Sequence, residues 1–209
     1  MSRISRLTVL TVAAVFTLAG CSSAIPADTD TDAGASAEAS TEASASTEET
    51  ESAEPDADAA AGEVFTGQGY SFSVPEGWGD PGQDLLGTGI DTYAADLVDI
   101  EDGFADNINV LLSPAGHIPN AGLEAAAIAE LETAGATNVS AGEPADVDGA
   151  EAIHVSATFE QDGVTYLIDQ FYPSTDTQTY VVTFSFSPEA TDARRSEVID
   201  SILASWTWS

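Results

Sequence analysis

The pattern of hydrophobic and polar residues divides this 209-residue chain into three parts. One apolar run, residues 7–18, lies near the start, and about 40 residues without an aromatic side chain follow it. All five Tyr, all three Trp and every Phe except Phe16 lie in the remainder. Because large apolar side chains form cores, residues 63–209 are predicted to be one globular domain.

Alternation of apolar and polar positions predicts strands throughout this domain. Residues 64–75 indicate a hairpin with its turn at 67–69. Further strands are expected at residues 92–100, 107–112, 153–159, 164–172 and 180–186. The segment 164–172 is apolar on both faces in part, which is typical of a central strand covered on both sides.

A helix is predicted in the middle of the domain. Asn120 is a suitable N-cap for a helix that runs to about Ala134, and Gly135 stands where a C-cap glycine belongs. The buried side of this helix is expected to consist of Leu123, Ala127 and Leu131.

A second helix is predicted to close the chain. Ser187 is expected to cap it, with Pro188 in its first turn and Glu189 and Asp192 near its positive end. Its buried stripe is expected to be Val198, Ile199, Ile202, Leu203 and Trp206. Strands, a helix, a strand meander and a closing helix predict an α+β fold, with an antiparallel β-sheet packed between helices.

The first 20 residues are typical of a secretion signal. Arg3 and Arg6 precede the apolar run. A membrane span needs about 20 apolar residues, and this run is shorter. An uncleaved anchor and a buried helix are the alternatives.

The stretch Leu-Ala-Gly-Cys at 18–21 resembles a bacterial lipobox, in which the cysteine is acylated and becomes the mature N-terminus. Cys21 is the only cysteine, and a single cysteine in an exported chain calls for an explanation. Two acyl chains on Cys21 would give stable membrane anchoring. A plain secretory signal with an unlipidated cysteine is the alternative.

Residues 21–62 are predicted to form a disordered acidic tether. They are mainly Ala, Ser, Thr, Asp and Glu, with no cation. Such a segment has too little apolar surface to offset the entropy of ordering. Asp28 begins a run that imitates a calcium loop, but Ala33 and Ala39 occupy the positions of its glycine and glutamate.

Charge excludes one class of partner. The chain has 36 acidic residues, four Arg and no Lys, which gives a net charge of −32. Such a surface repels nucleic-acid phosphates and anionic lipid headgroups. Only Arg194 and Arg195 are cationic within the domain, and they mark either a partner contact or a solvated helix face.

No catalytic motif is recognisable. His117 is expected to be exposed in a loop, whereas His154 is either a catalytic base or a histidine on the surface or packed under a helix. A catalytic triad needs a nucleophile and an acid within hydrogen-bond reach of the histidine, and no G-x-S-x-G elbow frames a serine. Two histidines and one cysteine do not suggest a zinc site. No cofactor or metal is therefore expected.

Two further groups of residues have competing interpretations. Carboxylates gather around Gly103 with a spacing that matches no known calcium loop, so a chance cluster is favoured over a calcium site. They are Asp96, Asp99, Glu101, Asp102 and Asp106. Trp78, Trp206 and Trp208 either line an apolar pocket or, as we expect for the first two, fill the core.

A polar ligand surface is predicted on one face of the sheet. The alternation places four polar side chains away from Ile153 and Val182, where they could hold a small polar ligand. They are His154, Ser156, Thr158 and Thr183.

The stretch YSFSVPEGW at 70–78, the middle helix, the meander and the ending ILASW at 202–206 resemble the PsbP/Mog1-like domains. Among these, the chain is most similar to LpqN-type lipoproteins of actinobacteria. The resemblance covers the whole domain and implies an antiparallel sheet between helical layers. It also implies a binding or assembly role without enzymatic activity.

These observations predict a non-catalytic, lipid-anchored binding or assembly module on the extracytoplasmic face of a bacterial cell membrane. Its expected partners are the membrane, through Cys21, and a lipid, glycan, peptide or envelope protein. An envelope-directed hydrolase or transferase with an unrecognised site is one alternative. A purely structural acidic spacer is another.

Overall fold

The computed structural model describes residues 58–82, 87–99, 104–161 and 163–209. The predicted signal peptide, Cys21 and most of the predicted tether lie outside the described residues. Glu101 and Asp102 of the acidic cluster also lie outside them. No helix among the described residues is long and apolar enough to span a membrane.

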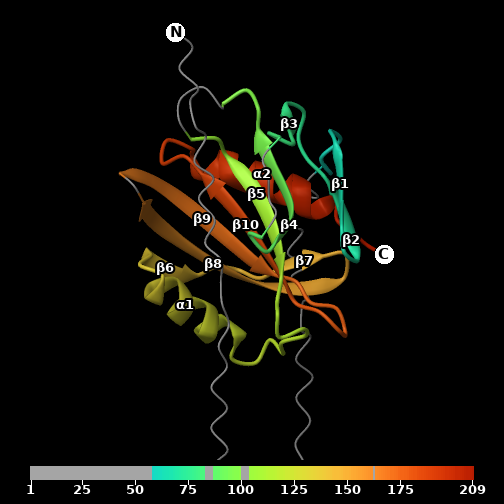
Figure 1. Cartoon of the computed structure of the whole chain (residues 1–209), viewed down its shortest axis with the longest axis vertical. Helices are drawn as coiled ribbons and strands as arrows, with labels where there is room; N and C mark the ends of the chain where they lie inside the picture. Colours follow the sequence, from blue (N-terminus) through green and yellow to red (C-terminus); the bar gives the residue numbers. More distant parts are fainter. Residues whose placement is uncertain (1–57, 83–86, 100–103, 162) are drawn as a thin grey trace, which may run out of the picture. The chain divides into compact units, whose positions relative to one another are not determined.

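An antiparallel sheet forms the centre of the domain (Figure 1). Within the described residues, seven strands follow one another across it, and β7 (Ala145–Val147) pairs with part of β8. Their order is β3 (Trp78–Gly79), β4 (Ile90–Asp96), β5 (Asn107–Leu112), β10 (Tyr180–Phe186), β9 (Val164–Tyr172), β8 (Ala150–Gln161) and β6 (Thr137–Ala141). Strand β10 lies at the centre of this order, and the long β10, β9 and β8 meander runs from there to the edge strand β6.

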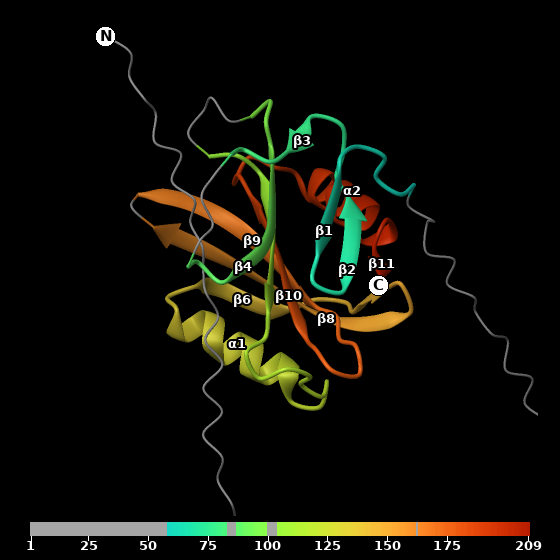
Figure 2. The same cartoon turned by 45° about the vertical axis from the view of Figure 1, so that its right-hand side comes forward.

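A second, three-stranded sheet lies beside β4 and α2 and joins the two ends of the domain (Figure 2). Its strands are β1 (Val64–Gly67), β2 (Tyr70–Ser73) and β11 (Thr207–Trp208). The hairpin predicted at 64–75 is confirmed, because β1 and β2 pair through a turn at Gln68 and Gly69.

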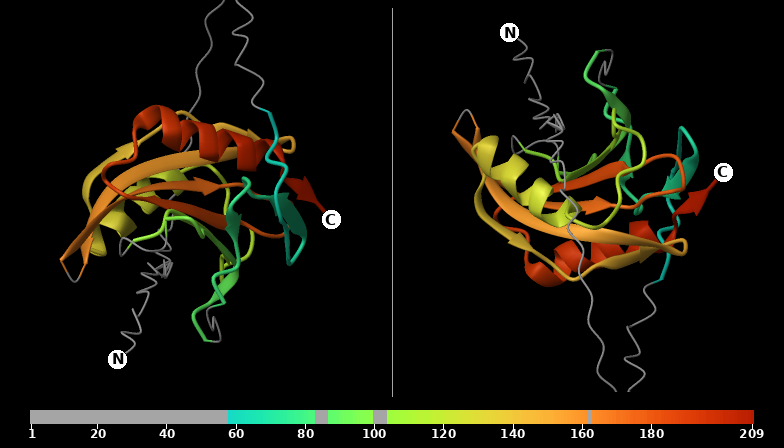
Figure 3. Two further views of the ribbon diagram at one scale, coloured as in Figure 1. Left: turned by 90° about the horizontal axis from the view of Figure 1, so that it is seen from above. Right: turned by 90° about the horizontal axis from the view of Figure 1, so that it is seen from below.

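The two helices lie on opposite faces of the main sheet (Figure 3). Helix α1 (Leu123–Thr133) packs on β6 and β8. Helix α2 (Asp192–Ala204) covers the other face with Val198, Ile199, Ile202 and Leu203. The predicted α+β fold, with an antiparallel sheet between helices, is confirmed.

Each face of the sheet has its own apolar core. The α2-side core includes Phe72, Val110, Phe171, Val182, Phe184 and Trp206. The α1-side core includes Leu123, Leu131, Ile153, Val155, Phe159 and Tyr166. Strands β8, β9 and β10 contribute to both, because successive side chains point to opposite faces.

The predicted strands at 107–112, 164–172 and 180–186 coincide with β5, β9 and β10. The strand predicted at 153–159 lies within the longer β8, and the one predicted at 92–100 is β4, which ends at Asp96. Four strands, β3, β6, β7 and β11, were not predicted. They are short, and β6 is mostly exposed and polar, so its sequence shows no apolar alternation.

The predicted start of α1 was wrong. The helix begins after Gly122, whose φ of 86° places it in the left-handed region. Asn120 makes a different contact, because its side-chain amide donates to Glu151 at 3.2 Å. The predicted end is confirmed, since Gly135 has φ of 93° and its N–H donates to the carbonyl of Glu132 at 3.1 Å, as in a glycine-terminated helix.

The predicted start of α2 was also wrong. Thr191 is the N-cap, and its hydroxyl accepts from the Arg194 N–H at 3.2 Å. Ser187 instead lies in a turn that precedes the helix, and its carbonyl accepts from the Ala190 N–H at 3.0 Å. Trp206 belongs to the predicted buried stripe but lies beyond the helix, which is capped at Ser205.

Candidate functional site

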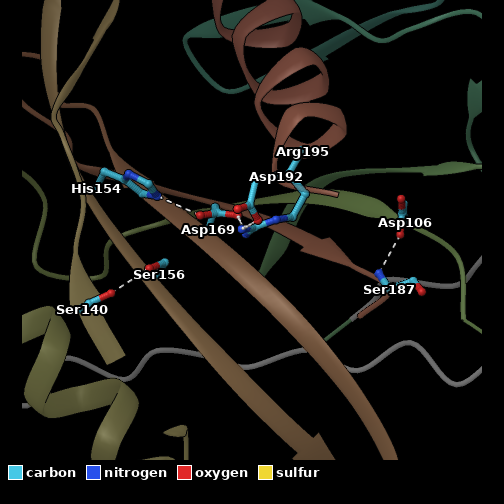
Figure 4. Close-up of polar contacts among 8 residues, drawn as sticks. All are labelled: Asp106, Ser140, His154, Ser156, Asp169, Ser187, Asp192 and Arg195. Atoms are coloured by element: carbon cyan, nitrogen blue, oxygen red, sulfur yellow. Dashed lines mark hydrogen bonds and ion pairs between the residues drawn. The ribbon is translucent and has the colours of Figure 1, made fainter. Parts of the chain in front are cut away.

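Four polar side chains form a network between the sheet and α2 (Figure 4). His154 of β8 and Arg195 of α2 bind the two oxygens of the same carboxylate, Asp169 of β9. The Nε2–Oδ1 distance to His154 is 2.9 Å, and the Nη1–Oδ2 distance to Arg195 is 2.7 Å. Arg195 also donates to Asp192 at 2.9 Å.

The buried carboxylate of Asp169 requires the partners that this network supplies. It is 5% exposed and interrupts the α2-side core, where an unpaired carboxylate would be costly. Burial lowers the pKa of Arg195, but the hydrogen bonds and charges of Asp192 and Asp169 outweigh this and leave the pKa raised. The guanidinium therefore stays charged, and the network ties α2 to the sheet.

The geometry around His154 differs from that of a catalytic triad. Its ring stacks on Phe171 at a centroid distance of 4.3 Å, with its Nε2 on Asp169. Ser156, on the same face of β8, has its hydroxyl 3.0 Å from that of Ser140. A nucleophilic serine would need its hydroxyl on the imidazole. The helix-packed interpretation of His154 fits this geometry.

Gly142 offers a test of how tightly His154 is held. A β-carbon at this position would overlap the His154 ring at Nδ1, so Gly142→Ala must displace the ring. We expect a loss of about 2 kcal/mol in the free energy of unfolding, as for other overpacked sites. In a His154→Ala background the same substitution should cost little. Urea unfolding of the four proteins checks this, and equal costs in both backgrounds would contradict the close packing.

The opposite face of the sheet carries polar side chains in its middle. We call them the polar row: Asn107, Asn109, Gln170, Tyr172, Thr183 and Ser185. The Gln170 amide donates to the Thr183 hydroxyl at 2.9 Å, and the Tyr172 hydroxyl donates to the Gln170 carbonyl at 2.8 Å. Gln170 is 0% exposed. These residues lie on β5, β9 and β10, whereas α1 packs on β6 and β8.

The prediction that all four polar residues share one face of the sheet was therefore wrong for Thr183. Thr183 is the register partner of Gln170, and Gln170 is the partner of Val155, so Thr183 lies on the α1 side. His154 is the partner of Phe171 and lies on the α2 side. The four residues grouped from the sequence belong to two faces, because alternation within one strand does not give the register between strands.

Two polar groups on the α1 side have no hydrogen-bond partner among the described residues. Both carboxylate oxygens of Glu130 and the hydroxyl of Tyr166 are buried in this way. Burial raises the pKa of Glu130 and raises that of Tyr166 to about 12. The pKa of Tyr172 is raised by burial first and then by the charge of Glu130. Leu131, the neighbour of Glu130 on α1, packs in the same core as Tyr172, which is part of the polar row.

The raised pKa of Glu130 predicts a pH-dependent stability. The folded protein keeps this proton to a higher pH than the unfolded chain, so the free energy of unfolding falls as the pH rises above about 4.5. Glu130→Met should therefore stabilise the domain by about 1 kcal/mol at pH 7, with less gain below pH 4.5. Thermal unfolding measures the difference. The exposed Glu132→Met is the control, and an equal gain in both variants would contradict the burial of Glu130.

The remaining candidate residues are His117 and the three tryptophans. His117 is exposed in its loop, as predicted. Trp78 and Trp206 are buried in the α2-side core, as expected. The Trp208 indole donates to the carbonyl of Val147 at 3.1 Å.

The acidic cluster is only partly described. Asp106 accepts from the Ser187 N–H at 2.8 Å, and burial raises its pKa, while Asp96 accepts from the Val98 N–H at 3.0 Å. Among the described residues, no group of three metal-ligating side chains is close enough to hold an ion.

Comparison with known proteins gives similar solved structures at low identity. No family model and no curated protein matches the sequence. PsbP (CyanoP) from Synechocystis is similar over 70% of this chain and 92% of its own, at 17% identity and a TM-score of 0.45. LpqN, involved in cell envelope biogenesis of Mycobacterium tuberculosis, is similar over 68% of this chain and 85% of its own, at 16% identity and a TM-score of 0.46.

A third similar structure is a protein from Bacteroides thetaiotaomicron, at 15% identity and a TM-score of 0.44. The match covers 71% of this chain but only 48% of the Bacteroides protein, so this chain spans about half of that protein's length. PsbP and LpqN, the two kinds of protein that the sequence resembles, are thus both among the similar structures.

Proposed function

We propose that this chain is a non-catalytic binding module of the cell envelope and that its ligand binds on the α1-side face of the sheet. The polar row is the observation that carries the proposal. On the α2 side, β5, β9 and β10 are lined by apolar residues such as Val110, Phe171 and Val182. On the α1 side, the same strands present amides and hydroxyls at the centre of the sheet.

A sheet face that only had to pack would be apolar, because buried polar groups contribute to stability only when they are fully hydrogen-bonded. Amides and hydroxyls beside apolar neighbours are the usual lining of a small-molecule site, where a few polar groups orient the ligand. Tyr93 is the register partner of Asn109 and adds an aromatic side chain at the edge of the polar row. The face therefore suits a ligand with an apolar body and at least one hydrogen-bonding group.

A matched pair of variants tests this proposal. The triple variant Gln170→Leu, Tyr172→Phe, Thr183→Val removes a whole hydrogen-bond chain, which limits the loss of stability. Thr158→Val, on the α2-side face of β8, is the control. We expect native mass spectrometry with an organic extract of the producing cell's envelope to show an adduct on the wild type and the control but not on the triple variant. An adduct retained by a folded triple variant would overturn the proposal.

We extend the proposal to the anchor. The apolar run and the Leu-Ala-Gly-Cys stretch support acylation of Cys21 at the membrane. Cys21→Ala should then move the protein from the detergent phase to the aqueous phase in a phase-partition experiment, because it removes the acyl chains. Wild-type protein found wholly in the aqueous phase would contradict lipid anchoring, and it would leave the binding face untouched.

A further inference from the structure

We infer that the ligand of this module is an amphiphilic amine, whose ammonium group binds Glu130. The inference rests on the proposed function and adds the chemical class of the ligand. Glu130 lies on α1 beside the buried Leu131 and one turn after the buried Ala127. Both of its carboxylate oxygens are buried and have no hydrogen-bond partner among the described residues.

An ionised carboxylate removed from water needs hydrogen bonds and a countercharge. Elsewhere the domain obeys this rule, because Asp169 has both Arg195 and His154. Among the carboxylates of the described residues, Glu130 alone has buried oxygens without a hydrogen-bond partner. In a site that binds a cation, the carboxylate would stay without a countercharge until the ligand binds.

The countercharge is not available from the domain's own cations. The chain has no lysine, and Arg194 and Arg195 both lie on α2. Arg194 pairs with Glu197 at 3.2 Å, and Arg195 pairs with Asp169. The other two arginines belong to the predicted signal peptide, so we expect an external cation to neutralise Glu130.

The α1-side core, which contains both Tyr166 and Leu131, the neighbour of Glu130, favours an organic cation with an apolar body. Tyr166 is 1% exposed, and its hydroxyl is free to accept a hydrogen bond, since it has no partner among the described residues. Its ring stacks on Phe104 and on Phe159, each at a centroid distance of 5.6 Å, so this core is apolar and aromatic. A carboxylate at an apolar core favours an alkylammonium group with an apolar body over a hydrated metal ion.

Octylamine and 1-octanol are suitable probes, because they share a chain and differ in charge at neutral pH. Isothermal titration of the purified protein in 0.15 M salt is expected to show at least tenfold tighter binding of octylamine. Glu130→Gln should remove that preference and leave octanol binding unchanged. Glu132→Gln, on the exposed side of α1, should behave as the wild type.

The outcomes separate the two proposals. Equal affinities of both probes for the wild type would overturn the assignment of an amine and leave the binding face intact. An equal loss of octylamine binding in the Glu130 and Glu132 variants would mean general charge attraction and would also overturn it. Failure of both probes to bind overturns the inference, and the binding face itself fails only if the envelope extract also gives no adduct.

Discussion

Replacing Arg195 by Met is expected to lower the free energy of unfolding by about 3 kcal/mol. The variant removes the 2.7 Å hydrogen bond to Asp169 and leaves that carboxylate 5% exposed with only His154 beside it. Removing one partner of a buried ion pair is costly mainly because the other charge stays buried. Urea unfolding at pH 7 provides the measurement.

Two companion variants show whether the cost has this origin. Asp192→Asn should change stability by less than about 0.5 kcal/mol, because the Asp192 side chain is 95% exposed and its ion pair with Arg195 is screened. Adding Asp169→Leu to Arg195→Met should restore most of the loss, since no charge is then left buried. A double variant as unstable as Arg195→Met alone would show that the lost stability came from packing of the arginine stem.

Trp206→Ala is expected to cost about 4 kcal/mol, the largest effect of a single substitution that we predict. Trp206 is 2% exposed, and its ring stacks on Tyr70 at 4.6 Å and on Phe72 at 5.2 Å. Trp206 follows α2 directly and stacks on two residues of β2, so it connects the three-stranded sheet to the helix. The substitution would leave a large cavity between them, and the surrounding rings can close it only in part.

Trp206→Phe separates the stacking from the volume. The indole N–H of Trp206 has no hydrogen-bond partner among the described residues, so phenylalanine loses no hydrogen bond and keeps an aromatic face. We expect it to cost roughly half as much as Trp206→Ala. Equal unfolding midpoints for the two variants would contradict the stacking of Trp206 on Tyr70 and Phe72.

The strands were predictable because burial on both faces leaves a strong pattern. Residues 164–172 and 180–186 are rich in aromatic and β-branched side chains, and their predicted bounds match β9 and β10. The helix starts were not predictable from capping residues alone. Asn120 and Ser187 are both good N-caps, but Gly122 and Thr191 come later and are the ones the helices use.

The residues of the candidate site leave a weaker signal in the sequence than the strands do. His154 was recognised as a candidate, but its partners Asp169 and Arg195 lie 15 and 41 residues away in sequence, and only the fold brings them together. A signal was nevertheless present, because Asp169 and Gln170 are polar residues in the middle of an otherwise apolar strand. Both polar networks begin at this pair, one on each face of the sheet.

The most direct test of the binding face is side-chain NMR of ¹⁵N-labelled protein with an organic extract of the envelope. The side-chain amides of Asn107, Asn109 and Gln170 lie on the α1 side, whereas the indole N–H groups of Trp78 and Trp206 belong to the α2-side core. We predict that the amide resonances shift and the two indole resonances stay in place. Shifts of the indoles with unchanged amides would contradict binding on the α1-side face.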